Sequence, residues 1–185
     1  TTLFRPLDAE AWDSLLKACR PARGQVAKVD ETMARNQALL WVLAETGIGT
    51  TEVCGLRVGD VDPEQGRLKV RGKGRKQRWV PLAHESMRHL LLYLDRYRSE
   101  KATEGKRKRI REDPLFVSEM GRPLSENGIA LLFGRLRRRA GIGRKDVNPT
   151  VLRESFAVRY LQAGGDLLTL RDIFGEEVST VVKRA

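Results

Sequence analysis

Cysteine is scarce in this chain of 185 residues, which contains only Cys19 and Cys54. Neither has a partner at the spacing of metal ligands, and both stand among apolar residues. His84 and His89 also lack an acidic or cysteine partner in a ligand pattern. The sequence therefore predicts two buried free thiols and no metal site, and it argues against a disulfide-rich secreted scaffold.

Long apolar runs are absent as well. The longest, Ala38 to Ala44, is far too short to span a bilayer. The first residues, TTLFRPLDAE, lack the basic start and the apolar core of a signal peptide. With 41% hydrophobic residues, we expect a single globular domain over residues 1–185, located in the cytoplasm and without membrane contact.

Acidic residues are outnumbered by basic ones. The chain has 35 Lys and Arg against 24 Asp and Glu, so its formal net charge is +11. A field of this sign attracts polyanions and favours encounter with nucleic acid. A basic surface that is only solvated is the alternative explanation, which charge alone leaves open.

Hydrophobic periodicity predicts a mainly α fold with a small antiparallel β-sheet, an α+β class. A β-hairpin with a glycine-rich basic turn is expected from the alternation in 67–71 and 78–82, and a short strand over 114–118. Another helix is expected to begin at Ser179. The expected helices span about residues 9–19, 31–45, 50–56, 84–98, 125–139, 149–163 and 166–174.

Three motifs occur in a fixed order along the chain. Residues 46–62, TGIGTTEVCGLRVGDVD, are similar to the pattern T-G-L-R-x-S-E-L-x-x-L-x-x-x-D-x-D. Residues 72–82, GKGRKQRWVPL, resemble G-K-G-x-K-x-R-x-V-P-L almost residue for residue. The stretch from 152 to 175 carries LRESFA, GGDL and IFG, which resemble H-x-L-R-H-T-F-A, G-x-D-L and L-L-G-H. Together they resemble the catalytic domain of tyrosine recombinases, the phage integrase family, over nearly the whole chain.

The resemblance implies a known reaction on double-stranded DNA. In the family, a tyrosine attacks a phosphodiester and forms a 3′-phosphotyrosine. Two arginines bind the non-bridging oxygens, and a lysine on the hairpin turn protonates the leaving oxygen. No cofactor is implied, and no small-molecule substrate. Family members usually carry an N-terminal DNA-binding domain, which we expect to be absent from this chain.

The family's site residues are only partly kept. The hairpin lysine is Lys73 and the second arginine is Arg153. Carboxylates are expected where charge accumulates in the transition state, which should abolish cleavage together with the other losses. The replaced positions are Gly49 for the first arginine, Thr150, Glu154 and Glu176 for histidines or their equivalents, and Ala185 for the tyrosine.

Several basic residues are expected to contact DNA. Lys73 has an alternative role as an ordinary turn lysine, and Arg153 has one as the partner of Glu154 or Glu176 in a structural network. The three tyrosines are expected in the core or at its rim rather than as nucleophiles. The predicted DNA-binding residues are Arg71, Lys73, Arg75, Lys76, Arg78 and Arg153.

Three functions remain open at this point. The favoured one is a DNA-binding, recombinase-like subunit of DNA recombination or integration that does not cleave. The second is an active recombinase whose nucleophile was replaced at Ala185 or comes from another chain. The third is a protein-interaction module that has lost DNA binding. Other recombinase subunits, bound through the C-terminal segment, are the expected protein partners.

Overall fold

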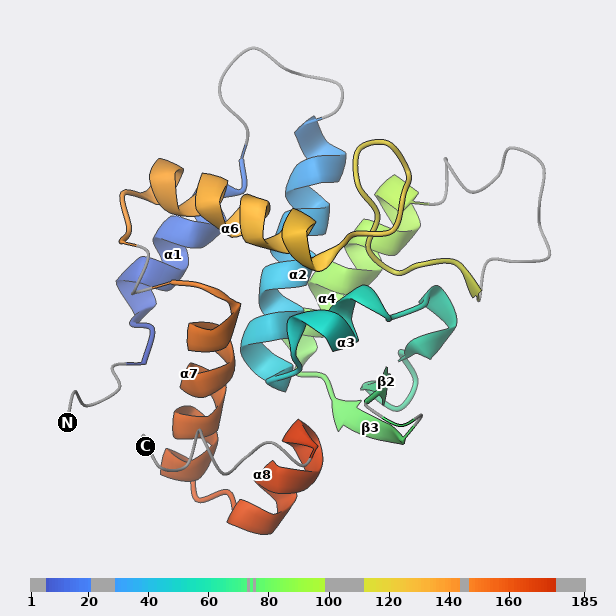
Figure 1. Ribbon diagram of the computed structural model, residues 1–185, viewed down its shortest axis with the longest axis vertical. Coiled ribbons are helices and arrows are strands. Elements are labelled where there is room, and N and C mark those ends of the chain that lie inside the picture. Colours follow the sequence, from blue (N-terminus) through green and yellow to red (C-terminus); the bar gives the residue numbers. More distant parts are fainter. Residues whose placement is uncertain are drawn as a thin grey trace.

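The computed structural model describes residues 6–20, 29–72, 74, 76–98, 112–143 and 147–175. It confirms the predicted fold class, because the chain is mainly helical and carries a small antiparallel sheet at one edge of the helices (Figure 1). The helices are α1 (Ala9–Ala18), α2 (Val29–Thr46), α3 (Thr50–Cys54), η1 (Val58–Asp60), α4 (His84–Leu92), η3 (Tyr93–Arg98), α6 (Glu126–Ala140), α7 (Pro149–Gln162) and α8 (Leu167–Phe174). The strands are β1 (Val61–Asp62), β2 (Arg67–Arg71) and β3 (Gln77–Pro81).

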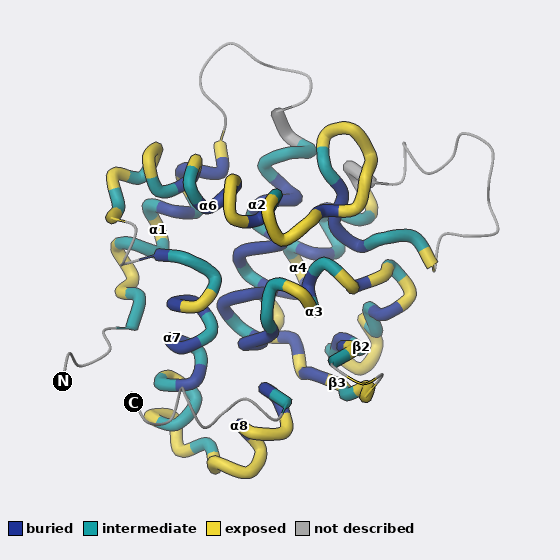
Figure 2. The backbone as a smooth tube through the Cα atoms, in the orientation of Figure 1, coloured by how far each residue is buried: buried dark blue, intermediate teal, exposed yellow. Residues whose placement is uncertain are grey.

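Helix α2 forms the centre of the core. It packs against α4 and α7, while α1 packs against α6. Its apolar stretch is buried on nearly all sides, and Ala38, Leu39, Leu40 and Val42 are 0% exposed. Figure 2 shows the same helix as mostly buried within the molecule. The helix expected over 31–45 is thus confirmed, and each of its buried leucines contributes roughly 1.5–3 kcal/mol to stability.

Short polar side chains begin four of the helices. Each accepts a hydrogen bond from an amide of the first turn, which otherwise has no partner. Ser125 accepts from the amide of Gly128 at the start of α6, and Gly141 ends the helix with φ of 69°. The caps are Asp8 for α1, Ser125 for α6, Asn148 for α7 and Asp166 for α8.

The sheet is antiparallel and has the order β1-β2-β3. Lys69 pairs with Trp79, and Val70 pairs with Arg78. Because successive side chains of a strand point to opposite faces, Leu68, Val70 and Val80 form a buried inner face. The predicted hairpin is confirmed to about one residue, and β1 is an addition that the sequence did not reveal.

Two predicted elements differ from the structure. The strand expected over 114–118 is wrong, because this stretch makes only isolated bridges, Arg57 to Pro114 and Val117 to Pro123. Pro114 has no amide hydrogen to extend a ladder. The helix expected over 84–98 changes to π-helical turns after Leu92. The helix expected from Ser179 lies outside the described residues.

Both cysteines are free thiols. Burial raises the pKa of Cys19 to about 12 and that of Cys54 to about 11. In the described part of the chain, no helix has the length and apolar character needed to cross a membrane. Nor does any group of histidine, cysteine and acidic residues in that part have the arrangement of a metal site.

Candidate functional site

Arg153 projects from α7 towards the ends of two other helices. Its Nη1 donates to the carbonyl of Gly47 at 2.7 Å, and its Nη2 donates to the carbonyl of Phe174 at 3.1 Å. The guanidinium also lies 4.2 Å from the centre of the Phe174 ring. With its side chain only 16% exposed, Arg153 joins α7 to the segment after α2 and to the last turn of α8.

A second arginine enters the same region from the sheet. Arg78 donates through Nη1 and Nη2 to the two oxygens of Glu52, at 2.5 and 3.0 Å. Its Nε donates to the carbonyl of Ile173 at 2.7 Å. Oε2 of Glu52 lies 3.8 Å from Nη1 of Arg153. The Glu52 carboxylate therefore stands between the two guanidinium groups.

Gly49 begins α3 directly beside this carboxylate. Its amide donates to Oε2 of Glu52 at 2.9 Å. A Cβ built on Gly49 would lie 3.5 Å from Nη1 of Arg153, an ordinary contact distance. A longer side chain at position 49 would therefore extend from the backbone directly beside the Arg153 guanidinium.

The basic hairpin lies beside this region. Arg71 forms an ion pair with Asp60, with Nη2 and Oδ1 2.7 Å apart, and remains 37% exposed. Lys76 is exposed. Lys73 and Arg75 lie outside the described residues. Among the six residues predicted to bind DNA, Arg71, Arg78 and Arg153 thus have partners within the fold, and their role towards DNA stays a prediction.

Comparison with known proteins decides the family. The model of the phage integrase family matches residues 5–184. The chain belongs to the phage integrase family. It is 37% identical to the tyrosine recombinase XerD of Oceanobacillus iheyensis over 147 residues, which cover 79% of this chain and 48% of that protein. It is 33% identical to the tyrosine recombinase XerC of Bacillus pumilus over 141 residues, covering 76% and 45%.

The solved structures agree with this assignment. The crystal structure of XerA recombinase superposes with a TM-score of 0.75 at 30% identity, covering 98% of this chain and 58% of that one. The fold is therefore that of a tyrosine recombinase catalytic domain, as predicted. The chain spans about half the length of the curated relatives it matches.

The other family positions are only partly visible. Thr150 is exposed in the first turn of α7, three residues before Arg153 and thus on the same helix face. Glu154 is only 7% exposed. Glu176 and Ala185 lie outside the described residues. The structure places Gly49 beside Arg153, and the roles of these and the other family positions stay predictions.

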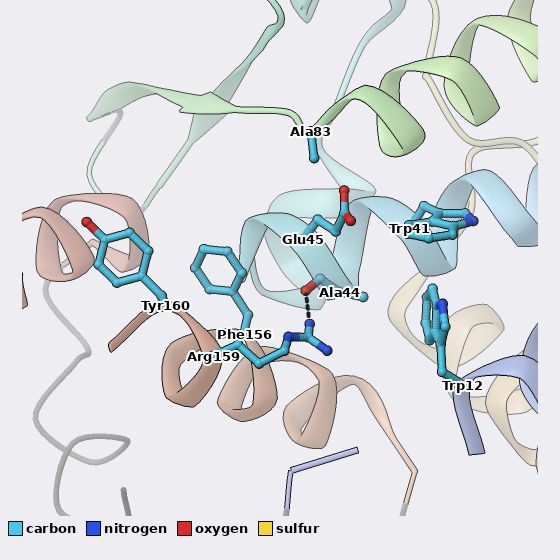
Figure 3. Close-up of a pocket in the computed structure, with 8 residues that line it drawn as sticks. All are labelled: Trp12, Trp41, Ala44, Glu45, Ala83, Phe156, Arg159 and Tyr160. Carbon is cyan, nitrogen blue, oxygen red and sulfur yellow. Dashed lines mark hydrogen bonds between the residues drawn. The ribbon is translucent and has the colours of Figure 1, made fainter. Parts of the chain in front are cut away.

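A separate pocket was not foreseen from the sequence. It has a volume of about 330 Å³ and lies between α1, α2 and α7 (Figure 3). Arg159 donates to the carbonyl of Ala44 at 2.8 Å, and Ser86 donates to Glu45 at 2.6 Å. No local motif could have revealed the pocket, because its walls come from distant segments. Its lining residues are Trp12, Trp41, Ala44, Glu45, Ala83, Phe156, Arg159 and Tyr160.

Glu52 was missed as a site residue. The signal was present, since it occupies the glutamate of the family pattern in residues 46–62. Its importance depends on Arg78, which is 26 residues away in the sequence and is brought close only by the hairpin.

Proposed function

We propose that this chain is a DNA-binding, recombinase-like domain of DNA recombination or integration that holds duplex DNA and does not cleave it. It would serve as a structural or regulatory subunit beside an active recombinase. Contact with other subunits would run through its C-terminal segment.

The proposal that cleavage is lost rests on Gly49. In the family, this position supplies the first of two arginines that bind the scissile phosphate. Glycine carries no charge, and the remaining Arg153 already donates to the carbonyls of Gly47 and Phe174. The loss of one group that stabilises transition-state charge typically costs ~10²–10³ in rate. The replacement of the tyrosine by Ala185 removes the nucleophile as well.

The DNA-binding part rests on charge. The net charge of +11 favours a polyanion, and the hairpin motif GKGRK at 72–76 is a basic turn. Relatives with this fold include XerH recombinase, solved with its difH substrate, which superposes with a TM-score of 0.75 at 23% identity. That protein's contact with DNA supports the same partner for this chain.

Binding can be tested by gel-shift titration of a duplex at several salt concentrations. We expect the binding constant to fall steeply with salt, because log K drops by about 0.9 against log salt for each phosphate contact. Neutralising Lys73, Arg75 and Lys76 with glutamine should weaken binding. Neutralising the exposed cations Lys17, Arg88 and Arg122 is the matched control. Absent or salt-independent binding would overturn the proposal.

Cleavage is tested with a nicked duplex that traps a covalent protein–DNA adduct on a denaturing gel. An active tyrosine recombinase serves as the positive control. We expect no adduct from this chain or from its Ala185→Tyr variant, since Gly49 still leaves one arginine at the site. An adduct from either protein would instead support an active recombinase whose nucleophile was replaced or is supplied by another chain.

A further inference from the structure

The outer face of the sheet carries an exposed tryptophan among basic residues. Trp79 is 45% exposed to solvent. Because side chains alternate along a strand, Trp79 points away from the face on which its neighbour Arg78 meets Glu52. The outer face is therefore separate from the Arg78–Glu52–Arg153 site.

The indole is held in a layered arrangement. The Arg67 guanidinium lies 4.2 Å from the centre of the Trp79 ring. Nε of Arg67 donates to Asp62 at 2.9 Å, which helps to hold the guanidinium over the ring. Lys69, the cross-strand partner of Trp79, has its Nζ 5.9 Å from the ring centre. The face is thus prepared to stack a further planar group at little cost in side-chain entropy.

The cations form a regular row along β2. Arg67, Lys69 and Arg71 alternate with buried residues, so they share the outer face and are spaced by about 6.6 Å, twice the rise of a strand residue. The row leads directly into the basic turn after Arg71. Asp60, which pairs with Arg71, is only 2% exposed. No ion pair with a carboxylate is formed by Lys69 within the described residues.

We propose that this outer face binds single-stranded nucleic acid. A base stacks on the Arg67–Trp79 pair, and the flanking phosphates contact Lys69 and Arg71. Aromatic platforms beside a track of cations are how proteins hold single strands without reading their sequence. The exposed indole beside the cations favours nucleic acid over an acidic protein segment, because bases stack on an aromatic ring and carboxylates do not. The outer face would bind a strand that separates from the duplex near the hairpin turn.

The test is fluorescence anisotropy with a labelled twelve-nucleotide thymidine strand. The whole chain is compared with its Trp79→Ala, Trp79→Phe and Lys69→Gln variants. Trp79→Ala should weaken binding about five- to a hundredfold, whereas Trp79→Phe, which keeps a stacking ring, should weaken it less. Lys69→Gln should reduce the salt slope by about 0.7. The control Leu168→Ala removes a side chain that is 65% exposed elsewhere on the molecule.

Distinct outcomes would overturn the inference. Equal affinities for the wild type and Trp79→Ala, with both proteins folded by circular dichroism, would show that the face does not bind the strand. If polyglutamate binds the wild type more tightly than Trp79→Ala and the thymidine strand does not, the face binds an acidic protein partner instead. Duplex binding should change less than about twofold in Trp79→Ala. If duplex binding fails in the wild type while strand binding depends on Trp79, only the proposed function falls.

Discussion

Arg78 and Glu52 form a two-point ion pair that connects β3 to α3, with both donor–acceptor distances at or below 3.0 Å. The side chains are 17% and 15% exposed. A paired geometry of this kind fixes the orientation of the guanidinium as well as its position. The same carboxylate accepts a hydrogen bond from the amide of Gly49, so the Glu52 side chain both joins β3 to α3 and caps the start of α3.

Breaking this ion pair should destabilise the fold. Arg78→Gln leaves the largely buried Glu52 carboxylate without its main partner, and we expect a loss of up to about 3 kcal/mol in the free energy of unfolding. Urea denaturation measures it. The control Arg122→Gln changes an exposed arginine in a turn. The double variant Glu52→Gln/Arg78→Gln should lose less than the sum of the single losses, and strict additivity would contradict direct coupling.

Gly47 should not tolerate a side chain. Its φ is +64°, and a Cβ there would approach Phe156 Cδ1 and Phe174 Cε2 to 2.7 Å. Gly47→Ala should therefore cost more than the roughly 1 kcal/mol of left-handed strain alone. Gly121→Ala is the matched control, because Gly121 has φ of +72° with nothing within 4 Å of the added Cβ. Equal thermal shifts for both variants would rule out the proposed clash.

Gly49→Arg should restore a second guanidinium beside Arg153. The backbone φ is −79°, and the nearest atoms to an added Cβ lie at 3.5 and 3.9 Å, so the substitution fits. We expect tighter duplex binding and a salt slope steeper by about 0.9, from one additional phosphate contact. Gly49→Gln, which is of similar length and uncharged, should leave the slope unchanged. A Gly49→Arg protein with the wild-type slope would show that position 49 does not face a phosphate.

Stability should fall in mild acid because of His89. Burial, followed by the charge of Arg88, lowers its pKa below the ordinary value of 6.5, against an opposing contribution from Glu85. The ring also stacks on Trp41 at 5.5 Å. Unfolding exposes the imidazole, which can then take up a proton. The contribution of His89 to stability is therefore present above about pH 6.5 and is lost as the pH falls below that value.

The measurement is the urea midpoint at pH 7.5 and pH 5.5. His89→Gln should reduce the difference between the two midpoints, and the exposed His84→Gln serves as the control. An unchanged difference in His89→Gln would assign the acid sensitivity to other groups.

Much of the fold could be predicted from the sequence, because its signals are local. The apolar stretch in α2, the cap Ser125 and the alternation around Trp79 each act within a few residues. Where prediction failed, the outcome depended on distant partners. The stretch at 114–118 looked like a strand, yet Leu115 pairs its amide with the carbonyl of Leu56 and Pro114 offers no donor.

The candidate site was predictable only as a set of positions. The motifs indicated Gly49 and Arg153, and the structure places Nη1 of Arg153 3.5 Å from where a Cβ at position 49 would lie. The central role of Glu52 in the site was not predicted. It arises because the hairpin places Arg78 against α3. Nor could the sequence show that Arg153 donates to main-chain carbonyls, because carbonyl groups leave no trace in side-chain patterns.

The two arginines of the site also hold the final carbonyls of α8, Arg78 at Ile173 and Arg153 at Phe174. These carbonyls lack helical partners of their own. An anion that binds either guanidinium must compete with these carbonyls. By reciprocal linkage, any contact that strengthens their hydrogen bonds to the arginines lowers the affinity for that anion. The stability of the C-terminal end of α8 is therefore thermodynamically coupled to anion binding at the site.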